Sequence, residues 1–144
     1  MIHYELLKPR QTLTGELYRV QLMSLNAEIH REKTEYATKH ESIFFIDDSA
    51  QPHRAKPVQN YVETVGPEVL PHPLYSPDLA QSEYHLFRSM QNALTGVRFT
   101  LPDDVKNWLD SYLAAKTAQF FWEGIHKLPE RWERVVLSDG HYFE

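Results

Sequence analysis

The sequence predicts one α/β domain with a short mixed sheet, flanking helices and a helical C-terminal third. The order strand, helix, strand between residues 43 and 70 is typical of a parallel βαβ unit. Apolar residues then recur at helical spacing through most of the remaining chain. The 144 residues, 42% of them hydrophobic, suit one domain with a packed core, residues 1–144.

The first half of the chain alternates expected strands and helices. Residues 1–7 alternate apolar and polar side chains, which predicts a half-buried strand. Residues 14–36 carry an apolar stripe behind Thr14, a good N-cap, and predict a long helix. Residues 43–46 are all apolar, as in a strand buried on both faces. A helix over 52–64, opened by Pro52, and a strand over 68–70 complete this half.

The second half is expected to be a loop followed by helices. Three prolines between residues 71 and 77 predict an extended loop. Ser82 is placed to cap a helix that ends near Leu94, and Thr100 to cap the next. Two shorter helices are expected over 118–125 and 129–137. The large aromatic side chains of this half have helical spacing, which favours core packing, with stacking on nucleic-acid bases as the alternative. They are Trp108, Phe120, Phe121, Trp122 and Trp132.

Composition narrows the classes of function. The chain has no cysteine, which excludes a disulfide scaffold and thiolate chemistry. No apolar run approaches the roughly 20 residues of a membrane span, so we expect no membrane partner. The net charge of −5 argues against a protein that binds nucleic acid only through a basic face.

Two carboxylates are the main candidates for chemistry. Asp48 follows the apolar run 43–46, and Glu83 opens a helix after the proline-rich loop, with 34 residues between them. Acids brought together from different elements are the usual ligands of Mg²⁺ or Mn²⁺. Asp47 is a weaker candidate of the same kind. The alternative is that all three are surface acids at the ends of elements.

Basic and imidazole side chains lie near these acids in sequence. Arg54, Lys56 and Arg88 are candidates for contacts with nucleic-acid phosphates, with solvated helix charges as the alternative. The spacing of three nearby histidines matches no zinc pattern, so structural or surface roles are expected for them. These are His53, His72 and His85.

Longer motifs make the prediction more specific. Three motifs resemble the catalytic core of the mariner-family DNA transposases. They are DSAQPHRAK at residues 48–56, EVLPHP at residues 68–73 and YSPDLAQSEYHLF at residues 75–87. The resemblance continues at residues 2–7, at Phe99, and through residues 105–108 and 124–132, so that it covers essentially the whole chain.

The resemblance implies a fold, an activity and a set of ligands. It implies a truncated RNase H-like fold in which three acids bind two divalent ions, Mg²⁺ or Mn²⁺. The ions serve to cleave DNA at transposon ends and to join those ends to a target. By motif, Asp48 matches the second acid and Glu83 the third. The implied partners are transposon-end DNA and a second copy of the chain, and the implied location is the nucleus.

Departures from the family pattern affect the expected activity. Glu83 stands where this branch usually has Asp, and its extra methylene displaces the carboxylate. No word here matches the family's first acid or its helix-turn-helix region. We therefore expect a partial catalytic domain without strand-transfer activity, marginally stable or paired with another chain. The alternatives are a retained DNA-binding or protein-interaction module, like the mariner-derived domain fused to a histone methyltransferase, and a decayed element without function.

Overall fold

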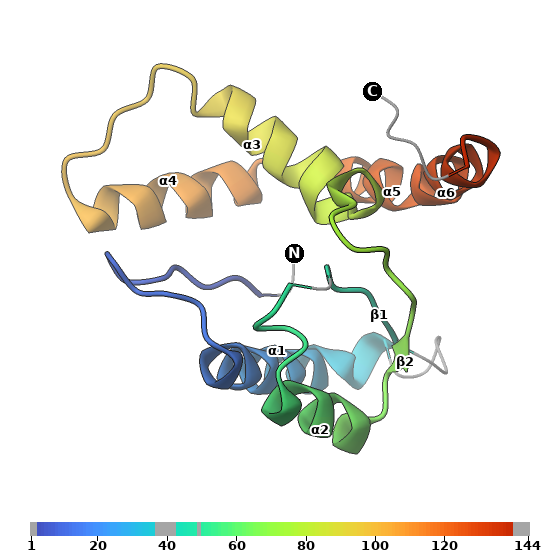
Figure 1. Cartoon of the computed structure of the whole chain (residues 1–144). Helices are drawn as coiled ribbons and strands as arrows, with labels where there is room; N and C mark the ends of the chain where they lie inside the picture. The colour runs from blue at the N-terminus through green and yellow to red at the C-terminus, as the bar shows by residue number, and fades with distance from the viewer. Residues whose placement is uncertain (1–2, 37–42, 49, 140–144) are drawn as a thin grey trace. The chain divides into compact units, whose positions relative to one another are not determined.

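A computed structural model describes residues 3–36, 43–48 and 50–139, except for the side chains of residues 33–36. The chain divides into two compact units, Met1–Tyr75 and Ser76–Glu144, and each is described by itself. Figure 1 labels the α-helices and strands of both units. The expectation of one domain over the whole chain stays a prediction.

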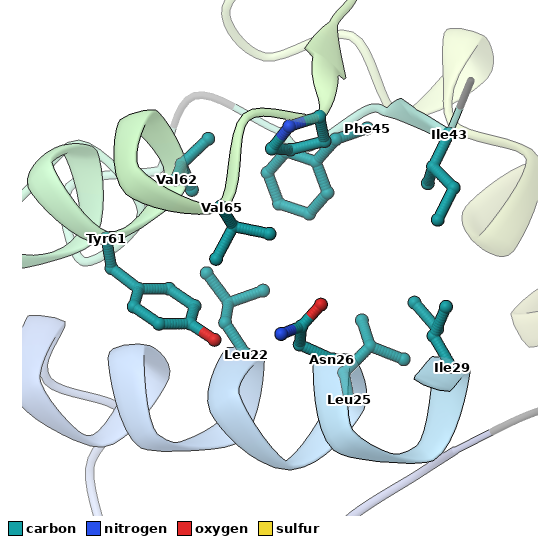
Figure 2. A pocket seen from close by; sticks show the side chains of 10 residues that line it. Leu22, Leu25, Asn26, Ile29, Ile43, Phe45, Tyr61, Val62 and Val65 are labelled. Carbon is teal, nitrogen blue, oxygen red and sulfur yellow. The ribbon is translucent and has the colours of Figure 1, made fainter. Parts of the chain in front are cut away.

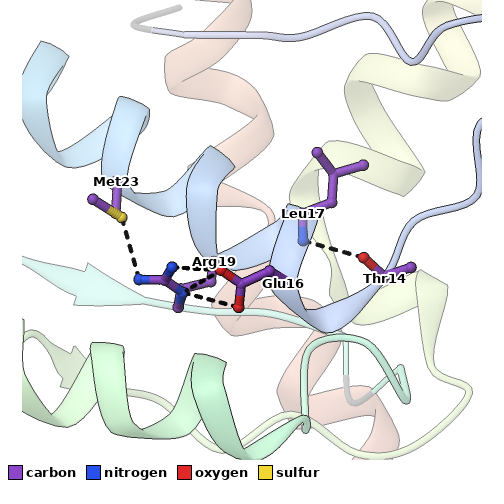
Figure 3. Close-up of polar contacts among 5 residues, drawn as sticks. All are labelled: Thr14, Glu16, Leu17, Arg19 and Met23. Carbon is purple, nitrogen blue, oxygen red and sulfur yellow. Dashed lines mark hydrogen bonds and ion pairs between the residues drawn. The ribbon is translucent and has the colours of Figure 1, made fainter.

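Helix α1, Gly15–Tyr36, begins where the sequence predicts. The Oγ1 atom of Thr14 accepts the backbone N–H of Leu17 at 3.2 Å, which confirms Thr14 as the N-cap. In the first turn, Glu16 forms an ion pair with Arg19 at 2.5 Å (Figure 3). The negative charge of Glu16 also lies at the positive end of the helix dipole, which favours the start of the helix there.

The sheet of the first unit has two short parallel strands. β1, Phe44–Phe45, pairs with β2, Glu68–Val69, with Phe44 opposite Glu68 and Phe45 opposite Val69. The predicted βαβ unit is confirmed. The prediction that 43–46 is buried on both faces is wrong, because Phe44 remains 56% exposed. Ile43 and Phe45, the alternate residues on either side of Phe44, line a cavity beside the helices.

Helix α2, Lys56–Val65, starts later than predicted. Residues 51–54 form turns instead, and Pro57 rather than Pro52 occupies the first helical turn. A proline fits either a turn or a first helical turn, so Pro52 alone could not fix the boundary. Gly66 ends the helix with φ of 72°, a left-handed conformation that favours glycine.

The core of the first unit lies between α1, α2 and β1. Val58 is 1% exposed and Leu22 is also buried. Beside them lies an apolar cavity of about 70 Å³, whose lining includes one amide side chain, that of Asn26 (Figure 2). The cavity is lined by side chains from both helices and from the strand region. They are Leu22, Leu25, Asn26, Ile29, Ile43, Phe45, Tyr61, Val62, Val65 and Pro67.

The second unit begins with two short helices of unusual type. η1, Pro77–Leu79, is a 3-10 turn that buries Leu79. η2, Ser82–Phe87, is a π-helix that continues into α3, Arg88–Ala93. Ser82 lies inside the helical segment and Gln81 precedes it without a side-chain cap, so the prediction of a Ser82 cap is wrong. Gly96, with φ of 80°, follows the end of α3.

The start of helix α4, Pro102–Ala114, is capped by Asp104 and not by Thr100 as predicted. The carboxylate of Asp104 accepts the backbone N–H of Leu101 at 3.0 Å and the hydroxyl of Thr100 at 3.1 Å. Thr100 therefore donates to Asp104, and its own oxygen caps no helical N–H in the way predicted. The carboxylate thus satisfies backbone N–H groups just before the helix, whereas the predicted Thr100 cap would have accepted an N–H within the first turn.

Helices α5, Ala118–His126, and α6, Leu128–Leu137, confirm the last two predicted helices. Thr117 caps α5 by accepting the N–H of Phe120 at 3.2 Å. The prediction that the aromatics of this half pack in the core holds only in part. Trp108, Phe120, Phe121 and Trp132 are half-buried, whereas Trp122 is 53% exposed and stacks on His126.

The expected first strand is not formed in the described residues. Residues 3–7 have no regular structure, and Leu6 and Leu7 are exposed. An alternating pattern needs a neighbouring strand to pair with, and the described part of the sheet holds only β1 and β2. Met1 and Ile2 of the same prediction lie outside the described residues, as does Ser49 of the family motif. Among the described residues no helix is long and apolar enough to cross a membrane.

Candidate metal and nucleic-acid site

Asp48 lies just beyond the carboxyl end of strand β1, where parallel sheets commonly place functional groups. Its side chain is 57% exposed. The Oδ1 atom lies 2.5 Å from Nδ1 of His53, which is only 14% exposed. The geometry of this contact is not that of a directed hydrogen bond, so it is a close approach of the ring nitrogen to the carboxylate oxygen.

Tyr18 of α1 and Asp47 lie close to the pair formed by Asp48 and His53. The Tyr18 ring stacks on His53 with centroids 4.0 Å apart and an interplanar angle of 27°. Burial raises the pKa of the Tyr18 hydroxyl, and the negative charges of Asp47 and Asp48 raise it further. The proximity of Tyr18 to the acids was missed from the sequence. Its only signal was membership of the apolar stripe of α1, which does not reveal a partner.

Asp47 differs from Asp48 in being half-buried. Burial raises the pKa of its carboxyl, while His53 and Arg54 lower it and Asp48 raises it again. Burial disfavours the charged form of a carboxyl, so a half-buried carboxyl holds its negative charge less firmly than an exposed one.

Glu83 is exposed in the first turn of η2 in the second unit. The two following side chains fix the backbone of η2 on α5. The Tyr84 hydroxyl donates to the carbonyl of Gly124 at 2.5 Å, and Nε2 of His85 contacts the carbonyl of Phe120 at 2.7 Å. Single π-helical turns occur often at functional sites. The exposed Glu83 thus stands on a firmly held turn.

Gly124 is needed for this packing because it is buried directly under His85. A Cβ atom at Gly124 would lie 2.6 Å from Cδ2 of the His85 ring, closer than real Cβ contacts come. Arg131 of α6 covers the other side, 4.1 Å from the centroid of Tyr84, and donates to the carbonyl of Asp78 at 3.0 Å. The structural role predicted for His85 is therefore confirmed.

The predicted basic residues are exposed. Arg54 and Lys56 precede or begin α2 in the first unit, and Arg88 begins α3 in the second. Arg54 is near enough to lower the pKa of Asp47.

His72, by contrast, is buried, with Nδ1 at 2.8 Å from the carbonyl of Pro73. Its structural role agrees with the prediction.

The donor chemistry fits a hard divalent cation, because carboxylate oxygens are the ligands that Mg²⁺ and Mn²⁺ prefer. Asp48 belongs to the first unit and Glu83 to the second. Among the described residues, no three histidine or acid side chains gather into a group that could hold a metal ion. The fit therefore rests on the type and exposure of the two ligands.

No family model matches the chain, but whole-chain relatives are clear. The mariner Mos1 transposase of Drosophila mauritiana is 49% identical over all 144 residues, which span 42% of its length. The human histone-lysine N-methyltransferase SETMAR is 35% identical over the same 144 residues, 21% of its length. The solved Mos1 catalytic domain with raltegravir and Mn matches 99% of this chain and 72% of its own, with a TM-score of 0.94 and 51% identity.

This chain belongs to the mariner transposase family. Its fold is that of the mariner catalytic domain, and the RNase H-like class implied by the motifs is confirmed. The chain spans less than half the length of the two curated relatives. A Mos1 paired-end complex with Mn also matches 99% of the chain, with a TM-score of 0.93 and 51% identity over 41% of that protein.

Proposed function

We propose that this mariner chain forms part of a metal-dependent site for DNA cleavage and strand transfer, with Asp48 and Glu83 as ligands. The observation that carries the proposal is the match of 99% of the chain to a mariner catalytic domain solved with Mn. The exposure of both carboxylates supports it, because a ligand must be open to the ion. The proposed cofactor is Mg²⁺ or Mn²⁺.

Divalent ions in such a site activate an attacking water and stabilise the leaving oxygen of a phosphodiester. In the proposed site, this chain would supply two of the metal ligands and contact the DNA. Asp48 supplies an oxygen at the end of β1, and Glu83 supplies one from the turn anchored on α5. Arg54, Lys56 and Arg88 are proposed to contact DNA phosphates, where exposed cations neutralise backbone charge.

The proposed substrate is transposon-end DNA, the proposed assembly a homodimer and the proposed location the nucleus. A Mos1 transposase paired-end complex was solved with the left transposon end, which supports the DNA partner. We also propose that the 144 residues alone do not carry out strand transfer. Only two of the family's three acid motifs match positions in this sequence, and Glu83 replaces the usual Asp.

The test is nicking of labelled transposon-end DNA in Mn²⁺, with the chain alone and with the remaining part of the Mos1 catalytic domain added. We expect nicking only in the second case, and its loss in Glu83→Ala. The matched control is Asp103→Asn, which changes an exposed acid in the first turn of α4. Nicking that survives Asp48→Ala and Glu83→Ala would contradict the assignment of ligands.

A second candidate function is a DNA-binding or protein-interaction module without catalysis. The 35% identity to SETMAR, a histone methyltransferase by name, favours it, as does the Glu at position 83. Binding of DNA in the presence of EDTA, with no nicking under any metal condition, would support this function over the first. This function predicts that each of three substitutions weakens DNA binding, and that the loss of affinity is larger at low salt than at high salt. The substitutions are Arg54→Gln, Lys56→Gln and Arg88→Gln.

A further inference from the structure

His53 and Asp48 form a contact that motif comparison alone does not explain. His53 lies in the turn between β1 and α2, five residues after Asp48, and its side chain is only 14% exposed. The ring nitrogen Nδ1 lies 2.5 Å from Oδ1 of the exposed carboxylate. A buried imidazole is therefore placed against a carboxylate that faces solvent.

The ring of His53 is held from the other side by Tyr18. The two rings stack 4.0 Å apart, and Tyr18 comes from α1, a different element of the same unit. Close packing of α1 against the turn supports this arrangement, since a Cβ on Gly15 would collide with Ala55. The imidazole thus has a fixed plane, set by a helix rather than by its own turn.

Stability alone gives a weak reason for the contact. A contact with a carboxylate as exposed as Asp48 contributes little to stability. Orientation gives a stronger reason. A carboxylate has two oxygens, so a buried ring against Oδ1 restricts the positions that the side chain can adopt and leaves the second oxygen as the one available to a ligand. Metal-binding carboxylates are commonly held in this way by a group that does not touch the metal.

We propose that His53, backed by the ring of Tyr18, is a positioning residue that fixes the Asp48 carboxylate for a divalent cation. The inference rests on the proposed function of Asp48 as a metal ligand. His53 touches neither the ion nor DNA in this account. It acts only through the carboxylate that it contacts.

The test is Mn²⁺ titration of the whole chain by calorimetry. We expect His53→Leu to weaken Mn²⁺ binding at least tenfold, in the range known for loss of a supporting residue. His53→Gln keeps a polar group and is expected to restore part of the affinity. The matched control is His30→Gln, an exposed histidine on α1 that contacts only the backbone carbonyl of Asn26 among the hydrogen bonds found.

A second measurement serves if His53→Leu does not fold. In the wild-type chain, Mn²⁺ is expected to broaden the ring proton signals of His53 well before those of His30, since paramagnetic broadening falls steeply with distance. The His53→Gln spectrum assigns the signals. Equal broadening of both rings in a chain that binds Mn²⁺ would overturn the inference.

The outcomes separate the inference from the proposed function. Saturable binding that Asp48→Ala abolishes, but that the His53 variants leave unchanged, would overturn the positioning role and keep the metal site. Absence of saturable binding in the folded wild-type chain would overturn both. Loss of affinity in His53→Leu with partial rescue in His53→Gln supports both.

Discussion

At the scale of residues, the sequence predicts the candidate acids but not their neighbours. Asp48 is a candidate because it follows an apolar run, and Glu83 because it opens a helix after the proline-rich loop, and both lie in family motifs. The stacking of Tyr18 on His53 depends on how α1 packs against a turn 35 residues later. No local pattern encodes such a contact, so the surroundings of the site required the structure.

The packing of Gly124 against His85 gives a prediction at this scale. We expect Gly124→Ala to lower the free energy of unfolding by about 1–3 kcal/mol, because the added methyl group overpacks against the imidazole. Urea denaturation measures it. In an otherwise unhindered helix the same change would stabilise by roughly 0.5–1 kcal/mol.

The control for this prediction is the background His85→Ala, which removes the ring that the methyl group would meet. There, Gly124→Ala should lose its destabilising effect. A destabilisation of equal size in both backgrounds would show that the His85 ring is not the cause.

At the scale of elements, helices were predicted well and their first turns less well. The ends of α1, α5 and α6 follow from apolar stripes and from caps such as Thr14. The start of α2 was misplaced because Pro52 suits a turn as well as a helix start. The π-helical form of η2 was not foreseen, since it depends on the bonds of Tyr84 and His85 to α5.

The cap of α4 gives a prediction with a pH dependence. Hydrogen bonds from the backbone of Leu101 and from Thr100 hold the pKa of the Asp104 carboxyl below its usual value of 3.8. A lowered folded-state pKa gives stability that is present above the unfolded-state pKa and is lost as pH falls through the folded-state pKa. We therefore expect Asp104→Asn to lower Tm at pH 7.

The measurement is thermal unfolding of both chains followed by circular dichroism from pH 7 to pH 2. The gap in Tm between wild type and Asp104→Asn should narrow as the pH falls below about 4. Asp103→Asn, one residue earlier and without those hydrogen bonds, should show a smaller gap at pH 7. A gap that is constant with pH would contradict the role of the charged carboxylate.

The packing of α1 on α2 gives a second prediction for elements. Val58→Ala is expected to destabilise the chain by about 1–3 kcal/mol, because Val58 is 1% exposed in the core beside the apolar cavity. Urea denaturation checks it. Val65→Ala on the same helix is the matched control and should cost less, since Val65 is exposed. Equal costs would contradict the placement of this core.

At the scale of the whole molecule, little apolar surface is fully buried among the described residues. The buried hydrophobic side chains there are Leu22, Val58 and Leu79, while Val136 is 73% exposed. Sequence patterns gave the fold class and the family, because both depend on element order and motifs. They did not give the division into two units, which depends on packing between distant segments.

Limited burial predicts a chain of low stability. We expect a free energy of unfolding at or below about 5 kcal/mol, the low end for native domains. Urea denaturation followed by tryptophan fluorescence and by circular dichroism measures it. A value near the upper end of the native range, about 15 kcal/mol, would contradict the expectation of marginal stability.

The proposal that most needs a test is the binding of a divalent cation by Asp48 and Glu83. The measurement is calorimetric titration of the folded chain with Mn²⁺, alongside Asp48→Ala, Glu83→Ala and Asp103→Asn. We expect saturable binding in wild type and in Asp103→Asn, and its loss in both of the other variants. Binding that persists without Asp48 and Glu83, or that is absent from the folded wild-type chain, would contradict it.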